Sequence, residues 1–212
     1  MGQNFVAILA HHLPLDDSLL TVLPEMLAPT RSPGLAIAIQ HLVAVENARS
    51  VDLARTYPSE RPAAPMMADE QWVVKEPRPL SVADYLAEYG WIDLDGPENV
   101  HLHIHRRSLT VSSAARWGAF LIDPPLRVAI RRVCHKLARI FGSPSALYVS
   151  DYWEPIDALC EGATMEEAIA AIEKRLGPPA TTIESIYQKK ENGTWSGDGY
   201  FIDTFADLDD AE

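Results

Sequence analysis

No stretch of the 212-residue chain is apolar for the roughly 20 residues that a membrane-spanning helix requires. The longest candidate, residues 35–45, is interrupted by Gln40 and His41. The N-terminus also lacks the basic segment with which a secretory signal begins. From these absences we expect a cytoplasmic protein without a membrane association.

Cysteine is scarce, and the common catalytic motifs are missing. Cys134 and Cys160 lie in apolar patterns without a C-x-x-C spacing, so we expect two buried thiols that act as small hydrophobic side chains. The chain has no glycine-rich phosphate loop, no nucleophile elbow and no H-E-x-x-H sequence. Without a completed catalytic motif, a non-enzymatic role is favoured.

Three histidines alternate with aliphatic residues in the segment His101-Leu102-His103-Ile104-His105. Successive side chains of a strand point to opposite faces, so an extended segment places all three imidazoles on one face. Imidazole is the commonest protein ligand for transition metals, and it titrates near neutral pH. The row therefore indicates either a zinc-type site or the polar face of a half-buried strand. Alternation alone favours the second interpretation.

Strand geometry limits the metal interpretation. Residues i and i+4 of a strand lie about 13 Å apart, too far for His101 and His105 to share one ion. A site would use two neighbouring histidines, either His101 with His103 or His103 with His105, and further ligands such as Asp151.

Charge is distributed unevenly along the acidic chain. Residues 101–142 contain eight Lys or Arg and one acid, for a net charge of +7, whereas the whole chain carries −12. Arg127, Arg131, His135 and Arg139 recur every four residues and so form one cationic stripe on a helix. Acids of the same chain or a protein partner are the expected counter-charges. Nucleic acid is disfavoured by the overall charge.

Aromatic and acidic residues gather in two further segments that we expect to be exposed loops. The segment Tyr152-Trp153-Glu154 follows Asp151 at the end of an expected strand, where ligand crevices often lie. Trp195 and Asp198 lie in a second, turn-rich segment. Together with Arg127, Arg131 and Arg139, these five residues are candidate contacts for a partner or an anion. The competing interpretation is a loop held by packed aromatic rings.

Periodicity and capping signals predict alternating strands and helices. Expected strands cover residues 4–10, 71–75, 100–106, 119–122, 145–149, 183–190 and 200–205. Expected helices cover residues 16–27, 33–55, 81–89, 124–141 and 164–176. Capping boxes begin the third and fifth helices, and Asn192-Gly193 predicts a C-terminal hairpin.

The order of these elements predicts an α+β or irregular α/β fold, with helices packed on a mixed sheet. We expect one domain over residues 1–212. A variant of this expectation has an N-terminal helical subdomain, residues 1–56, joined by the proline-rich connection 57–79.

The leading functional hypothesis is a cytoplasmic module that binds another protein through an acidic surface and holds no cofactor. In general composition the chain is similar to small acidic antidotes, such as immunity proteins of bacterial toxin systems, but no motif carries that similarity. The alternative is a metal-dependent hydrolase that uses the histidine row with zinc or another divalent ion. A third hypothesis, nucleic-acid binding through the cationic stripe, is the least favoured.

Overall fold

The computed structural model describes residues 4–32, 34–35, 37–38, 71–75, 81–97, 100–151, 153–189, 193 and 195–208. Most of the helix expected over residues 33–55 and most of the connection 57–79 lie outside these residues. The division into a domain and a subdomain therefore stays a prediction.

Seven strands form one sheet in the order β2-β3-β4-β5-β1-β6-β9. Every neighbouring pair is antiparallel. The strands are β2 (Val73–Val74), β3 (Ile92–Asp95), β4 (Val100–Ile104), β5 (Ser108–Arg116), β1 (Asn4–Ala10), β6 (Ala146–Ser150) and β9 (Phe201–Asp203). The expected α+β class, with helices packed on a sheet, is confirmed.

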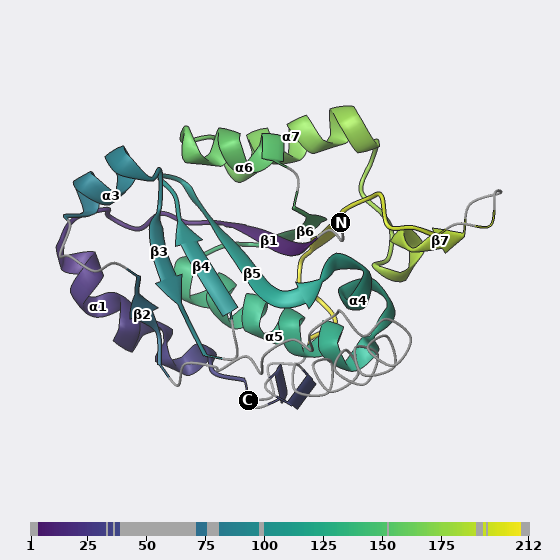
Figure 1. Ribbon diagram of the computed structural model, residues 1–212, viewed down its shortest axis with the longest axis horizontal. Helices are drawn as coiled ribbons and strands as arrows, with labels where there is room; N and C mark the ends of the chain where they lie inside the picture. Colours follow the sequence, from purple (N-terminus) through teal and green to yellow (C-terminus); the bar gives the residue numbers. More distant parts are fainter. Residues whose placement is uncertain are drawn as a thin grey trace, which may run out of the picture.

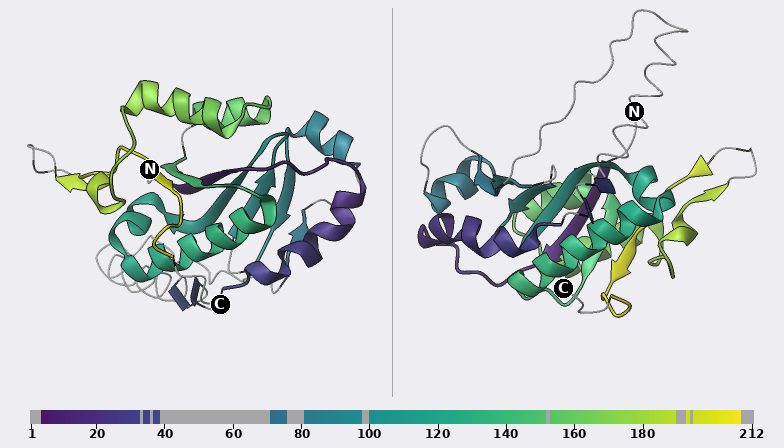
Figure 2. Two further views of the ribbon diagram at one scale, coloured as in Figure 1. Left: turned by 180° about the vertical axis from the view of Figure 1, so that it is seen from behind. Right: turned by 90° about the horizontal axis from the view of Figure 1, so that it is seen from below.

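Two hydrophobic cores lie on the two faces of this sheet (Figures 1 and 2). The larger core packs the sheet against α1 (Ser18–Leu27), α3 (Val82–Glu88), α4 (Trp117–Ile122) and α5 (Pro124–Phe141). The smaller core packs β1 and β6 against α6 (Trp153–Cys160) and α7 (Met165–Leu176). Strands β1 and β6 are buried on both faces, which explains their nearly continuous apolar sequences.

Local signals determine the ends of several helices as expected. The helix α5 begins with Asp123, whose side chain accepts a hydrogen bond from the Leu126 N–H, and ends at Gly142 with a φ of 71°. Ser81 and Thr164 form the predicted capping boxes with Asp84 and Glu167. No helix in the described part of the chain has the length and apolar character needed to cross a bilayer.

The strand expected over residues 119–122 is wrong, because these residues belong to α4. Trp117, Phe120 and Leu121 follow helical spacing and are all buried in the larger core. The strand that precedes them, β5, escaped prediction because serine, threonine and alanine dominate its sequence.

The C-terminal hairpin is confirmed, but its strands are shorter than expected. Residues 184–186 form a 3-10 helix, η2 (Glu184–Ile186), and only β7 (Gln188–Lys189) follows as a strand. It pairs with β8 (Trp195–Ser196) in a separate two-stranded ribbon that extends from the body of the protein (Figure 1). The strand expected at residues 200–205 is β9, which pairs with β6 in the main sheet instead.

Candidate functional site

The histidine row is extended, as predicted, and it forms part of a set of polar cross-strand pairs. The pairing register places His101 of β4 between Asp95 of β3 and Ser112 of β5. Two residues further along β4, His103 lies between Asp93 and Thr110 of the same neighbouring strands. Directly paired residues share one face of a sheet. We call these six residues the polar ladder. Val100, Leu102 and Ile104 point to the other face and are buried in the larger core.

Each aspartate of the polar ladder contacts one imidazole. The Nδ1–H of His101 donates to Asp95 Oδ1 at 2.6 Å, and His103 Nε2 lies 3.4 Å from Asp93 Oδ1. Lys75 Nζ also lies 3.3 Å from Asp95. Burial opposes ionisation of Asp95, but hydrogen bonds from His101 and Lys75 outweigh it and hold the pKa of this carboxyl below its usual value.

His105, the third histidine of the row, has a different environment. Its side chain has no exposure, and Trp91 packs against both His103 and His105 with ring centroids 5.2 and 5.9 Å away. Its Nε2 lies 3.3 Å from Thr110 Oγ1, whereas Nδ1 is buried without a hydrogen-bond partner in the described structure. Burial, together with the neighbouring His103 and His11, lowers the pKa of His105 to about 3.

The polar ladder lies on the part of this sheet face that α6 and α7 do not pack against. The core below these two helices uses side chains of β1 and β6, which share this face but follow β3, β4 and β5 in the strand order (Figure 1). The aspartates of the polar ladder are 24–29% exposed and its two histidines 33–38% exposed. Asp95 and His101 are therefore both ordered by a hydrogen bond and accessible to another molecule. Asp93 and His103 are as accessible, but their contact is not a hydrogen bond, and Asp93 Oδ1 is buried without a hydrogen-bond partner.

The structure does not bring the candidate metal ligands together. Asp151 follows β6, three strands away from the histidines of β4, which corresponds to about 14 Å at the usual strand spacing. Its carboxylate instead accepts two hydrogen bonds of 2.9 Å from Asn4. Among the described residues, no three His, Cys, Asp or Glu side chains are arranged to hold a metal ion. We therefore assign none of them as a metal ligand.

The cationic stripe of α5 finds its counter-charges within the chain. Arg131 forms hydrogen bonds of 2.6 and 3.0 Å with Asp203 and of 3.0 and 2.6 Å with Asp207. Arg127 pairs with Glu184 and donates to the Leu121 carbonyl at 2.7 Å. Both arginine side chains are only 11% exposed. These contacts support the expectation that acids of the same chain neutralise the stripe. We therefore do not include Arg127 or Arg131 in a contact surface. Arg139 is exposed and has an interaction of its own.

The two aromatic and acidic segments lie away from the polar ladder along the chain and in the sheet order. Trp153 and Glu154 begin the helix α6 instead of forming a loop, and Tyr152 lies outside the described residues. Trp195 belongs to the two-stranded ribbon, and Asp198 forms a local turn with Ser196 through hydrogen bonds of 2.6 and 3.3 Å. Their role as partner contacts stays a prediction.

The cysteines offer no reactive thiol. Cys134 is fully buried, and burial raises the pKa of its thiol to about 12, so it is protonated at neutral pH. Cys160 is half-buried, more exposed than expected, and burial raises its pKa as well.

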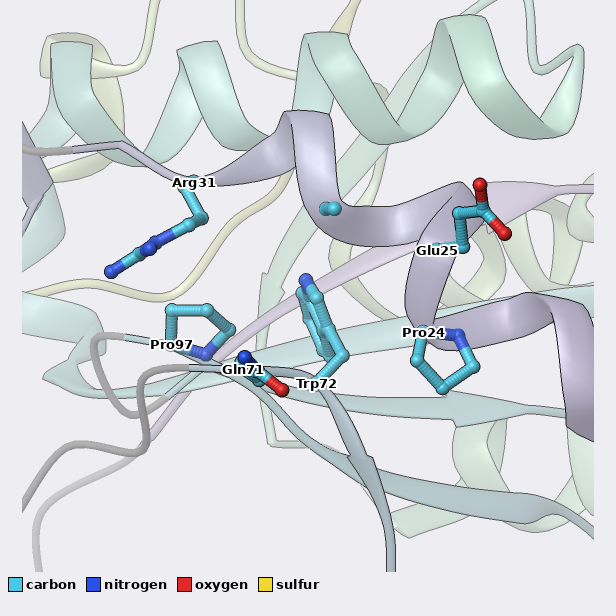
Figure 3. Close-up of a pocket in the computed structure, with 7 residues that line it drawn as sticks. Pro24, Glu25, Arg31, Gln71, Trp72 and Pro97 are labelled. Carbon is cyan, nitrogen blue, oxygen red and sulfur yellow. The ribbon is translucent and has the colours of Figure 1, made fainter.

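A separate hollow of about 330 Å³ lies between α1 and the β2 edge of the sheet (Figure 3). Its lining consists of Pro24, Glu25, Ala28, Arg31, Gln71, Trp72 and Pro97. The indole Nε1–H of Trp72 donates to Thr30 Oγ1 at 3.0 Å. Glu25 and Arg31 lie on opposite sides of the indole and do not converge on one point (Figure 3).

Sequence reasoning missed the aspartates of the polar ladder, although a signal for them was present. The sequence Ile92-Asp93-Leu94-Asp95 alternates as the histidine row does, and Gly96-Pro97 marks a turn between the two. A hairpin reading of that pattern would have placed the acids opposite the imidazoles. Comparisons of the chain with protein-family models, with curated proteins and with solved structures found no match, so the geometry of the site is the basis for a functional proposal.

Proposed function

We propose that the chain is a protein-binding module and that the polar ladder, with Trp91 beside it, is its contact surface. The observation that supports this proposal is the partial exposure of both aspartate–histidine pairs, together with the order that a hydrogen bond gives to Asp95 and His101. Side chains already held in place lose little conformational entropy when a partner binds. Trp91 adds an aromatic ring of the kind that is enriched in protein interfaces.

Charge argues for a basic partner. The chain carries a net charge of −12, and Asp93 and Asp95 provide negative charge within the contact surface itself. A long-range negative potential accelerates encounter with a basic surface and weakens as salt is added. A basic protein that is blocked by an acidic antidote is one partner of this chemistry. The free cysteines fit the cytoplasmic location expected from the sequence.

A catalytic role for the same residues has less support. Asp95, His101 and Ser112 follow one another across β3, β4 and β5, and these are the residue types of a hydrolytic triad. The structure shows no hydrogen bond between Ser112 and His101, and the hollow lined by Trp72 lies elsewhere, beside α1. The alternative of a metal-dependent hydrolase lacks a third ligand among the described residues.

The proposal is tested with a charge-neutralising double variant, Asp93→Asn with Asp95→Asn, immobilised beside the wild-type protein in a native capture from cells that express it. A matched control, Glu161→Gln with Glu166→Gln, removes the same charge from exposed positions on the α6–α7 side. We expect a captured protein to be depleted about tenfold on the first variant, as for loss of about 1.4 kcal/mol, and retained on the second. Equal capture by all three, or equal loss on both variants, contradicts a role for the polar ladder.

A further inference from the structure

Two buried histidines join the end of β1 to the turn between β4 and β5. His11 is 3% exposed and His105 is fully buried. The Nε2–H of His11 donates to the backbone carbonyl of His105 at 2.8 Å, and its Nδ1 accepts the N–H of Leu13 at 3.2 Å. Because one ring nitrogen donates and the other accepts, this arrangement requires a neutral imidazole. A proton on Nδ1 would place two donors face to face.

The surroundings of both rings disfavour an imidazolium. Among the described residues, the titratable groups that oppose a charge on these rings are imidazoles: His12 beside His11, and His103 and His11 beside His105. Phe141 of α5, Trp91 before β3 and Thr110 of β5 are uncharged neighbours. The backbone of His105, Ser108 and Gly90 acts in the opposite direction and favours the charged form, but burial outweighs it. Asp93 of β3 pairs with His103 across the strands. Burial is the main reason that the pKa of His11, like that of His105, lies below its usual value.

The contacts of this region hold only a local part of the structure. The N–H of His11 donates to the Arg107 carbonyl at 3.3 Å, and the N–H of His105 donates to the Ser108 carbonyl at 2.9 Å. These bonds lie at the end of the sheet, beyond the strands that both cores share. The pairing of β1 with β6 runs from Phe5 to Leu9 and includes neither of these bonds.

We propose that His11 and His105 form an acid-sensitive latch, which holds the segment after β1 against the β4–β5 turn and opens when either ring takes up a proton. Below about pH 6.5 an opened, solvated imidazole binds protons that the closed form does not, so a falling pH favours opening. Opening releases His103 and Trp91, which pack on His105, and so alters one end of the polar ladder. The inference goes beyond the proposed function and requires no partner.

Amide hydrogen exchange of the purified full-length chain tests the latch. At about pH 5 we expect the protection of the Leu13, His11 and His105 amides, corrected for intrinsic exchange, to fall at least about 30-fold relative to about pH 7.5, because uptake of a single proton 1.5 pH units below 6.5 gives this factor. The amides of β6 serve as the internal reference and keep their protection. In the double variant His11→Gln with His105→Gln, the protection of the same region becomes independent of pH. The exposed His12→Gln variant retains the wild-type response.

Two results would overturn the latch: wild-type protection that is equal at both pH values, or a pH response that persists in the double variant. If the double variant does not fold, the imidazole resonances of the wild-type protein decide by NMR. Titration of His11 and His105 near pH 6.5 with unchanged amide protection shows that the rings take up protons in the closed form, and it rejects the proposal.

Discussion

At the scale of single residues, Asp203 is the most connected acid of the described structure. Its buried carboxylate binds Arg131 through two hydrogen bonds, accepts the Tyr148 hydroxyl at 3.0 Å and accepts the Phe205 N–H at 2.8 Å. The pKa of Arg131 is raised by its hydrogen bonds with Asp207 and Asp203, so the arginine is always charged. The Arg131 guanidinium is charged and little exposed, so water cannot easily take the place of the Asp203 carboxylate as its partner.

The substitution Asp203→Asn is expected to lower the free energy of unfolding by about 3–5 kcal/mol, because it leaves a largely buried arginine with an exposed carboxylate, Asp207, as its remaining charged partner. Asp207→Asn removes the other carboxylate of Arg131, but that side chain is 71% exposed, and we expect a loss of about 1 kcal/mol or less. Urea denaturation of both variants measures the difference. Equal losses would show that burial does not determine the strength of the two pairs.

At the scale of elements, the turn between β3 and β4 depends on the absence of a side chain at Gly96. A Cβ at this position would lie 2.5 Å from the indole ring of Trp72, which is itself buried. The Gly96 N–H bonds to the Val100 carbonyl at 2.8 Å and so closes the turn. This close approach also sets the hairpin that carries the aspartates and histidines of the polar ladder.

We therefore expect Gly96→Ala to lower the free energy of unfolding by about 1–3 kcal/mol, through displacement of Trp72. The matched variant Gly118→Ala lies in α4, where nothing is within 4 Å of the added methyl group. It is expected to stabilise the protein by about 0.4–1 kcal/mol, because alanine restricts the unfolded chain. Thermal unfolding followed by circular dichroism gives the sign of each change, and a stable Gly96→Ala variant would show that Trp72 moves without cost.

At the scale of the whole molecule, one sheet connects the two cores. The residues Val6, Ile8, Leu147 and Val149 serve the smaller core, while Phe5, Ala7, Leu9, Ala146 and Tyr148 of the same two strands serve the larger one. Since β1 and β6 contribute side chains to both cores, unfolding of one core removes strands against which the other core packs. A single cooperative transition follows from this arrangement.

The substitution Ile172→Ala in α7 should lower the free energy of unfolding by about 2–5 kcal/mol, because it leaves a cavity in the smaller core. The control Ile122→Ala changes a side chain that is 58% exposed, and we expect an effect within about 0.5 kcal/mol. In the Ile172→Ala protein, unfolding followed by helix content and by tryptophan fluorescence should still coincide. Separate transitions would show that α6 and α7 unfold as an independent unit.

Patterns of neighbouring residues were enough to predict several elements of the fold. The proline pair and glycine at the ends of α5, the two capping boxes, the buried β1 and the extended histidine row are all local patterns, and each was predicted. Other local patterns were misread, since short apolar runs such as residues 119–122 suit a helix or a strand until packing decides.

Which polar groups meet across the fold was not predictable before the strands and helices were placed. Asp203 lies 72 residues from Arg131 in the chain, and His105 lies 94 residues from His11. No local pattern encodes such pairs, because strand order and helix placement follow from burying both faces of the sheet at once. The aspartates opposite His101 and His103 show both contributions: alternation placed them on one face, and the register of β3 with β4 set the contact.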